Sequence, residues 1–165
     1  MSVDKLTTCL WFDGQAEEAA LFYTSIFKNS KVTGRHYFPE AGKEFHGREA
    51  GSLMMIDFEL NDQKFVGLNG GPYFKFTEAI SIIINCKDQA EVDYYWDKLG
   101  EGGDKSKRQC GWLADKFGLS WQIVPDDFRK MLNSTEIEKR DRAYVAMLHM
   151  EKLDIVGLRK AFDGE

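Results

Sequence analysis

The segment Cys110–Pro125, CGWLADKFGLSWQIVP, combines two short apolar runs with one polar corner. The runs CGWLA and LSWQIVP are typical of strands, and the corner Asp115–Gly118 ends in a glycine that tolerates the positive φ of a tight turn. The sequence therefore predicts a buried β-hairpin here. Ser120 and Gln122 alternate with apolar residues, so both side chains belong to one face of the sheet. Polar side chains on so apolar a strand indicate a cavity or a partner on that face.

The composition limits the classes of protein that the chain can represent. Its 165 residues, 43% of them hydrophobic, fit one domain or two small repeats that share a core. A net charge of −5 argues against nucleic-acid binding, which normally needs a basic face. No apolar run approaches the roughly 20 residues that cross a bilayer, and the first residues lack a secretion-signal pattern. With three scattered cysteines, we expect a cytoplasmic protein with reduced thiols and no membrane partner.

The first half of the chain predicts one strand, one helix and three further strands. From periodicity and breakers, we expect these elements at Leu6–Phe12, Gln15–Lys28, Lys31–Phe38, Ser52–Leu60 and Lys64–Asn69. The polar segment Pro39–Gly51 interrupts them. Its glycines and its lack of periodicity predict a mobile loop, which is the best candidate for a lid.

The second half repeats this order and then continues into helices. The strands and the helix are expected at Ala79–Cys86, Asp88–Leu99, Lys105–Gln109 and the two arms of the hairpin. Three helices should follow, the first starting at Pro125 and running to Leu132. A capping box formed by Thr135 and Glu138 predicts the second, to about His149, and Asp154 should cap the third, to Phe162.

A sequence echo supports an internal repeat. QAEEAALF at 15–22 aligns with QAEVDYYW at 89–96, an offset of 74 residues. On the strand face away from the helices, this alignment matches Thr7 with Ser81 and Trp11 with Asn85. At the far end, matching Pro72 with Pro125 places Asn69 on Gln122.

The repeat predicts an α+β fold made of two βαβββ modules within a single domain, 1–165. The modules would span 1–75 and 76–126, with a C-terminal helical extension at 127–165. Side by side, they would form one curved mixed sheet around a trough, with the helices outside. Such a trough is the expected ligand site.

The chain resembles the vicinal oxygen chelate superfamily, which includes glyoxalase, bleomycin-resistance and extradiol-dioxygenase folds. Within it, the chain is most similar to the PhnB-like, or 3-demethylubiquinone 3-methyltransferase-like, branch. The matching segments are LWFDGQAEEAALFYTSIF (10–27), ISIIINCKDQAEVDYYWDKL (80–99), GWLADKFGLSWQIVP (111–125) and MLHMEKLDIVGLRKAF (147–162). The resemblance implies paired βαβββ modules, commonly as a homodimer, with a site inside the curved sheet.

The resemblance also indicates where a metal would bind. Metal-using members carry His or Glu on the first and last strand of each module. The matching positions here are all neutral, and they are Thr7 (or Thr8), Asn69, Ser81 and Gln122. Because hydroxyls and amides alone hold a divalent transition metal weakly, we expect a degenerate metal site and no cofactor, with a divalent metal disfavoured.

The first hypothesis is a metal-independent small-molecule-binding protein of unassigned activity, present as a homodimer. Six residues would line its site: Thr7, Trp11, Asn69, Ser81, Ser120 and Gln122. Each has a structural alternative. Ser120 and Gln122 can be buried groups bonded to neighbouring backbone, Trp11 can be core, and Asn69 can be a turn residue.

Other functions stay open, and whether the protein is an enzyme is undecided. A metal-dependent lyase, isomerase or dioxygenase would have to recruit its metal from His46, Glu49 or the substrate, although a solvated loop is favoured for that segment. The methyltransferase label conflicts with the glycine-rich Gly100–Gly103, which follows a helix instead of opening one. Asp13 and Asp115 are turn residues before they are general bases, and a purely structural dimer module is the third possibility.

Overall fold

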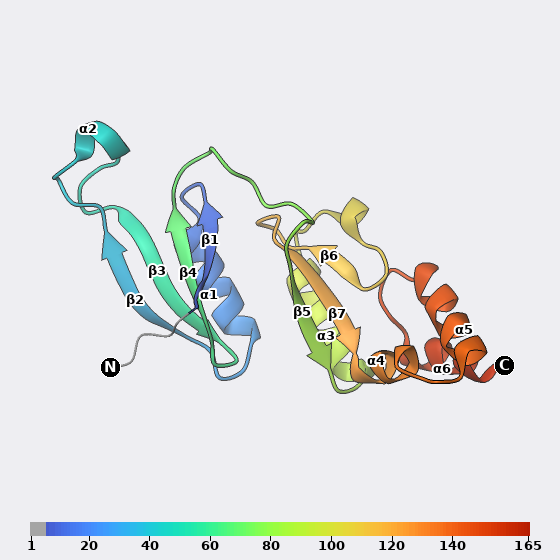
Figure 1. Cartoon of the computed structure of the whole chain (residues 1–165). Coiled ribbons are helices and arrows are strands. Elements are labelled where there is room, and N and C mark those ends of the chain that lie inside the picture. Colours follow the sequence, from blue (N-terminus) through green and yellow to red (C-terminus); the bar gives the residue numbers. More distant parts are fainter. Residues whose placement is uncertain (1–5) are drawn as a thin grey trace. The chain divides into compact units, whose positions relative to one another are not determined.

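The computed structural model describes residues 6–165, which form two compact units (Figure 1). The first unit ends at Lys75 and the second begins at Phe76. Each unit contains one open sheet with a helix packed against one face, which confirms the predicted α+β class. None of the helices in the described part of the chain is long and apolar enough to span a membrane.

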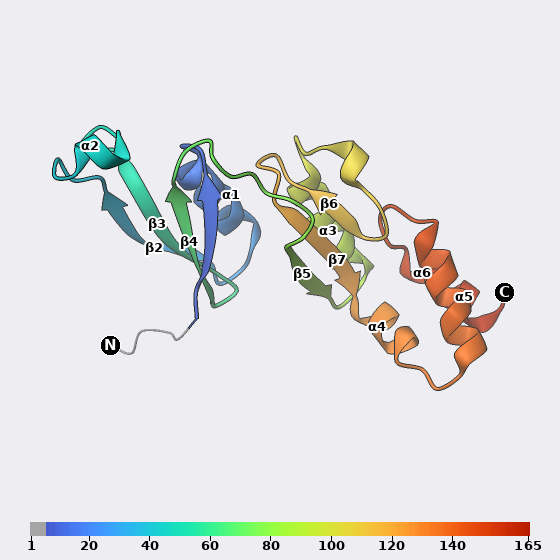
Figure 2. The same ribbon diagram turned by 45° about the horizontal axis from the view of Figure 1, so that its top comes forward.

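The first unit has the predicted βαβββ order (Figures 1 and 2). Its elements are β1 (Thr8–Phe12), α1 (Ala16–Ile26), β2 (Lys31–Tyr37), α2 (Lys43–His46), β3 (Leu53–Leu60) and β4 (Gln63–Asn69). The sheet order is β1-β4-β3-β2, in which β1 runs parallel to β4 and the other pairs are antiparallel.

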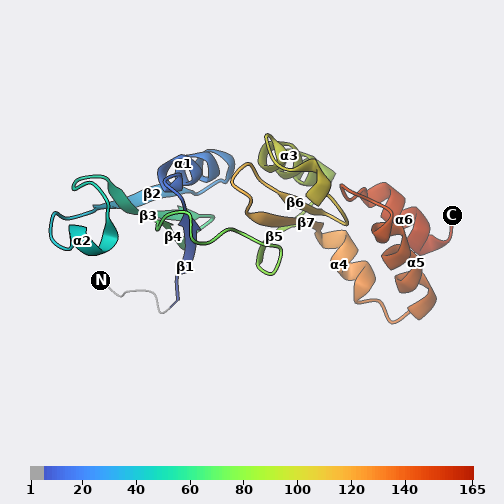
Figure 3. The ribbon, with the colours of Figure 1, turned by 90° about the horizontal axis from the view of Figure 1, so that it is seen from above.

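Helix α1 covers one face of the first sheet, as Figure 3 shows from above. Its small residues Ala16, Ala19 and Ala20 are fully buried, which brings the helix backbone close to the strands. Leu10 and Phe12 of β1 are buried on this side, whereas the alternating side chains point the other way. Below, the two sides of each sheet are called the helix-covered face and the open face.

The connections in the first unit place asparagine, aspartate and glycine where the backbone has positive φ. Asn61 and Asp62 both have positive φ, 47° and 66°, which confirms the predicted turn between β3 and β4. The segment predicted to be an aperiodic loop instead contains α2. Gly42 and Gly47, at φ 82° and 63°, flank this single turn of helix in the left-handed conformation.

The second unit contains three strands in its sheet instead of the four predicted. Its elements are β5 (Ser81–Cys86), α3 (Gln89–Gly100), a 3₁₀ turn η1 (Lys105–Lys107), β6 (Trp112–Ala114) and β7 (Ser120–Pro125). The order is β5-β7-β6, with β5 parallel to β7. The predicted strand Lys105–Gln109 is wrong because Asp104 Oδ1 accepts hydrogen bonds from the backbone N and the Oγ of Ser106, at 2.9 and 2.7 Å, which turns the chain.

The β6–β7 hairpin is organised around the buried carboxylate of Asp115, which is only 2% exposed. Oδ1 accepts from the backbone N of Phe117 and Leu119, at 2.9 and 3.1 Å. Oδ2 accepts from Trp121 Nε1 at 2.8 Å, and Gly118 has the expected positive φ of 88°. Asp115 is therefore a turn residue, as predicted, and it connects the turn to the core.

Three C-terminal helices complete the second unit: α4 (Asp126–Leu132), α5 (Ile137–Leu148) and α6 (Ile155–Asp163). They share a core built on Phe128, Met131 and Leu158, and Val124 of β7 packs against it. Asp154 caps α6 as predicted, but the predicted capping box of α5 is wrong. Its N-cap is Glu136, which makes no side-chain cap, and the backbone N of Glu136 bonds to Ser134 Oγ instead.

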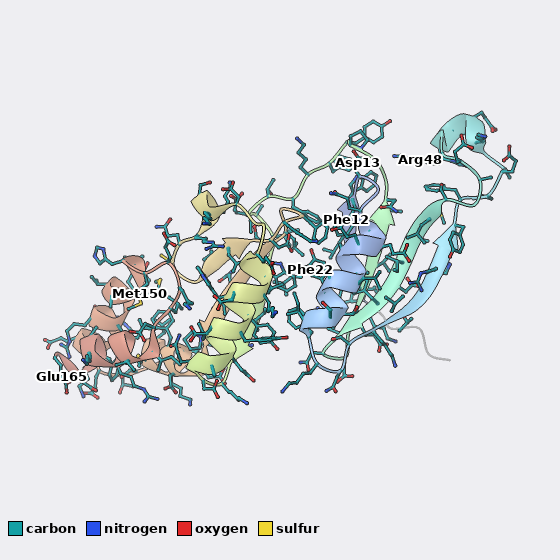
Figure 4. All side chains as sticks on the ribbon, turned by 180° about the vertical axis from the view of Figure 1, so that it is seen from behind. Phe12, Asp13, Phe22, Arg48, Met150 and Glu165 are labelled. Carbon is teal, nitrogen blue, oxygen red and sulfur yellow. The ribbon has the colours of Figure 1, made fainter. Side chains whose placement is uncertain are left out.

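Backbone bonds hold the α5–α6 connection against the start of β6. Cys110 N donates to Met150 O and Gly111 N donates to Glu151 O, both at 2.7 Å. Met150 is labelled in Figure 4, where the chain leaves α5. The side chain of Gln89, at the start of α3, also binds this connection through Leu153 O and the backbone N of Ile155. The helical extension is therefore an integral part of the second unit.

Candidate functional site

The open face of the second sheet brings together three of the predicted site residues. The β5–β7 register places Ser81 opposite Ser120, and Gln122 is two residues further along the same face. Gln122 Nε2 donates a hydrogen bond to Ser81 Oγ at 2.8 Å. Ser120 is nearly buried, at 3% exposure, whereas Ser81 and Gln122 are half-buried. The site therefore contains a bonded amide–hydroxyl pair on a face that also carries Ile83 and Val124.

A cavity of about 440 Å³ adjoins this pair within the second unit. Trp112, Gln122 and Val124 of the sheet form one side of it. The other side comes from α4, α5 and the residues that follow them, including Arg129 and Asn133. The remaining lining is mostly leucine, methionine and phenylalanine, so the cavity has apolar walls and few polar groups.

In the first unit, Trp11 uses its polar atom locally. Trp11 Nε1 donates to Gly71 O at 2.8 Å, and the indole packs edge-to-face on Phe74 with ring centroids 4.8 Å apart. A Cβ on Gly70 would lie 2.1 Å from the indole, so this close approach requires glycine. Thr7 precedes β1 and is exposed. Trp11 is half-buried, and its indole N–H is bonded within its own unit.

Asn69 lies on the helix-covered face of the first sheet, because its register partner in β1 is Phe12. Its Oδ1 accepts from the backbone N of Ala16 at 3.0 Å, at the start of α1, and its Nδ2 donates to Leu53 O at 3.0 Å. The side chain therefore supplies a helix cap, which α1 lacks from its own N-cap residue.

The strand registers also correct the predicted match between Asn69 and Gln122. Cys9 pairs with Val66 in the first unit, and Ile83 pairs with Gln122 in the second. Since Cys9 corresponds to Ile83 in the repeat, Val66 is the counterpart of Gln122. The sequence alignment had matched Pro72 with Pro125. That match gave Gln122 the wrong counterpart, because the chain leaves the last strand differently in the two units.

A histidine–aspartate pair on the open face of the first sheet was missed from the sequence. His36 Nε2 lies 2.7 Å from Asp57 Oδ2. Gly34 makes room for it, because a Cβ there would lie 2.8 Å from the same carboxylate oxygen. A register irregularity between Val32 and Gly34 shifts the alternation of β2, so strict alternation could not place His36.

The loop residues considered as recruited metal ligands have separate partners. His46 Nδ1 accepts from the backbone N of Arg48 at 3.1 Å, and its ring packs on Phe38 at 5.0 Å. Glu49 pairs with Lys43 at 3.7 Å. Across residues 6–165, no three His, Cys, Asp or Glu side chains gather in a way that could hold a metal ion.

A smaller cavity of about 230 Å³ lies in the first unit beside Asn69. Glu17 of α1 and Arg48, which follows α2 and is labelled in Figure 4, also line it. The cavity therefore carries charges of both signs. It differs in this respect from the cavity beside Gln122.

The surroundings of two cysteines, Cys86 and Cys9, do not activate their thiols. Burial raises the pKa of the Cys86 thiol to about 12, and the nearby Glu91 carboxylate adds to the shift. Burial also raises the pKa of Cys9. Because the reactive form is the thiolate, neither environment favours a nucleophile at neutral pH.

Comparison with known proteins identifies the family. Residues 4–124 match the family described as 3-demethylubiquinone-9 3-methyltransferase. The chain belongs to this family. A PhnB protein from Bacillus cereus is 33% identical over 74% of this chain and 99% of its own, with a TM-score of 0.63. This match confirms the resemblance to the PhnB-like branch.

More distant structures share the fold alone. Protein PA1353 from Pseudomonas aeruginosa is 18% identical, over 75% of this chain and 100% of its own, with a TM-score of 0.55. The fosfomycin resistance protein FosX from Mesorhizobium loti is 12% identical, over 81% of this chain and 100% of its own, with a TM-score of 0.53. No curated protein matches the chain. The family match ends at residue 124, so α4, α5 and α6 lie beyond it.

Proposed function

We propose that this protein of the glyoxalase/bleomycin-resistance type binds a small, partly apolar molecule without a metal. The observation that carries the proposal is the Gln122–Ser81 hydrogen bond on the open face, beside a cavity of about 440 Å³. The volume lies in the range of about 300–1,000 Å³ that is usual for small-molecule sites.

The chemistry of the pair favours an organic ligand over a metal ion. Gln122 donates its amide N–H to Ser81, and its carbonyl oxygen is the natural acceptor for a ligand N–H or O–H. Divalent transition metals prefer imidazole, thiolate or carboxylate ligands, none of which this pair supplies. Neutral groups on an apolar floor suit a molecule that makes one or two hydrogen bonds and buries the rest of its surface.

The methyl transfer named in the family description receives no support from the glycine-rich segment. Gly100 is the last residue of α3, and a Cβ on Gly103 would lie 2.0 Å from the carbonyl oxygen of Ala114. These glycines allow close packing between the end of α3 and β6. A cofactor-binding glycine turn follows a strand and opens a helix, which is the opposite arrangement.

We include a homodimer and a cytoplasmic location in the proposal. Exposed apolar side chains on α5, among them Tyr144, Val145 and Leu148, provide surface for a contact between subunits. Cys9, Cys86 and Cys110 are all unpaired, as expected for a reducing compartment.

The test is a small-molecule screen on protein treated with a chelator, followed by calorimetric titration of the compounds that raise the melting temperature. Gln122→Ala and Ser81→Ala should each weaken binding about fivefold, the value of one neutral hydrogen bond. Gln63→Ala, at an exposed position of β4, is the matched control and should change nothing.

Two results would contradict the proposal. One is binding that neither Gln122→Ala nor Ser81→Ala weakens. The other is a tightly held ion in the purified protein, about one per chain, whose removal abolishes ligand binding. As a complementary measurement, Gln122→Glu should create divalent-metal binding that the native side chain does not support.

A further inference from the structure

We infer that the cavity beside Gln122 selects small organic acids, whose carboxylate binds Arg129 of α4 while the apolar body packs against Trp112 and Val124. This inference rests on the proposed function, because the same cavity and the same glutamine are involved. It adds the chemical class of the ligand, and it assigns the selection to the C-terminal helices.

Arg129 differs from other arginines in the second unit. Among residues 6–165, its guanidinium makes no hydrogen bond or ion pair. By contrast, Arg159 is bonded to Asp127, and Arg142 donates to the carbonyls of Ala161 and Phe162 at the end of α6. Arg129 lines the cavity, and its guanidinium offers hydrogen-bond donors and no acceptor.

The charge of the cavity is unusual for this protein. Among the described residues 6–165, Arg129 is the sole charged residue that lines it, although the whole chain carries a net charge of −5. Two other cavities of the second unit contain acidic residues beside their cations, such as Glu78 with Lys107 and Glu138 with Arg142. An exposed guanidinium beside apolar walls, with no carboxylate among the described lining residues, favours an anion, and its planar fork matches a carboxylate.

The other polar groups of the cavity complete a site for an acid with a hydrogen-bonding body. Asn133 lies four residues after Arg129, where α4 ends, and Gln122 lies on the sheet opposite. The remaining walls, including Phe128 and Leu153, are apolar. An aryl or alkyl carboxylate would bury its hydrocarbon there and keep its charge at Arg129.

The position of these residues in the chain assigns the selectivity to the extension. The family match ends at residue 124, whereas Arg129 and Asn133 come after it. The extension is nonetheless fixed to the sheet, because Val124 packs into its core and Cys110 N bonds to Met150 O at 2.7 Å. The proposed selectivity therefore belongs to the C-terminal helices, which lie beyond the family match.

The experiment compares three probes that differ in one terminal group: 4-phenylbutyrate, 4-phenylbutyramide and 4-phenylbutylamine. Binding is measured by titration calorimetry and by tryptophan fluorescence, since Trp112 lines the cavity. The native protein should bind the acid about tenfold more tightly than the amide, and the amine least of all. Arg129→Gln should abolish the preference, and Arg129→Lys should retain part of it.

Arg140→Gln is the control variant, because Arg140 of α5 pairs with Asp141 and does not line the cavity. It should keep the full preference for the acid. Because the Arg129 side chain is exposed, melting curves of its variants should match the native protein.

Each other outcome overturns the inference in a recognisable way. Equal affinity for acid and amide overturns the charge selection, yet the proposed function stands if Gln122→Ala weakens both. A preference that persists in Arg129→Gln assigns the selection to another residue and also overturns the inference. Binding of none of the three probes excludes an organic-acid site here, while the proposed function is decided separately by the Ser81 and Gln122 variants.

Discussion

The two units share one arrangement of strands and helix, but they carry different residues at equivalent positions. In each, the first strand runs parallel to the last, and one helix covers one face. At the position where the second sheet has Gln122, the first has Val66. The open face of the second sheet carries its bonded pair on β5 and β7, whereas the first carries His36 and Asp57 on β2 and β3. A repeated scaffold has therefore not repeated its polar site.

The amide side chains of Asn69 and Gln122 show that the same chemical group has a different role in each unit. Asn69 uses its acceptor on Ala16 N and its donor on Leu53 O, so its polar groups serve the fold. Gln122 makes one bond to Ser81 and lines a cavity. The same chemical group thus stabilises structure in one unit and is available for binding in the other, depending on the face of the sheet that it occupies.

The largest effect should come from Asp115→Ala in the second unit. Its carboxylate accepts three hydrogen bonds in a buried setting, so its loss removes the bonds from the Trp121 indole N–H and from the backbone N–H groups of Phe117 and Leu119. We expect a loss of about 3 kcal/mol in the free energy of unfolding. Urea unfolding followed by fluorescence and circular dichroism measures it.

The matched control is Asp13→Ala in the first unit, at an exposed turn after β1. It should change the free energy of unfolding by less than about 0.5 kcal/mol. Equal losses in the two variants would contradict the assignment of Asp115 as the residue that organises the hairpin.

A smaller change in stability should distinguish the structural role of Asn69 from the binding role of Gln122. Asn69→Ala removes the side-chain cap of α1 and the hydrogen bond to Leu53 O, so the free energy of unfolding should fall by about 2 kcal/mol. Ligand binding to the second unit should stay unchanged. Gln122→Ala should show the reverse pattern, with weaker binding and a loss of stability below about 1 kcal/mol. If Asn69→Ala weakened binding without lowering stability, the structural role of Asn69 would be wrong.

The smallest change in stability should come from the ion pair between Asp127 of α4 and Arg159 of α6, and it should depend on pH. The hydrogen bond from Arg159, with a contribution from Lys130, lowers the pKa of Asp127. A lowered folded-state pKa stabilises the protein above the ordinary aspartate pKa, and that contribution is lost as the pH falls through the folded-state value. Asp127→Asn should therefore cost less than about 1 kcal/mol at pH 7, and the difference should shrink as the pH falls below the ordinary aspartate pKa of 3.8.

Denaturation curves across this pH range test the sign of the effect, with Asp141→Asn on α5 as the exposed control. A difference that grew as the pH fell would contradict the assigned direction of the Asp127 shift. Because the carboxylate is partly solvated, raising the salt concentration should reduce the effect.

Local chemistry explains which parts of the fold were predicted correctly. Alanine-rich periodicity marked α1, an Asx cap marked α6, and the Asp115–Gly118 corner marked the central hairpin. Where a prediction failed, a neighbouring residue imposed a different backbone conformation. Asp104 bends the chain where alternation predicted a strand, and Gly42 starts a helical turn where polarity predicted a loop.

The sequence by itself determined the α+β class, the repeat and the open-face position of Gln122, because these depend on periods of 2 and 3.6 residues along the chain. Only the tertiary structure decided that Asn69 faces the helix, that His36 meets Asp57, and that Arg129 is unopposed in its cavity. The physical reason is that strand register, bulges and helix packing join residues far apart in sequence, and no local period specifies them.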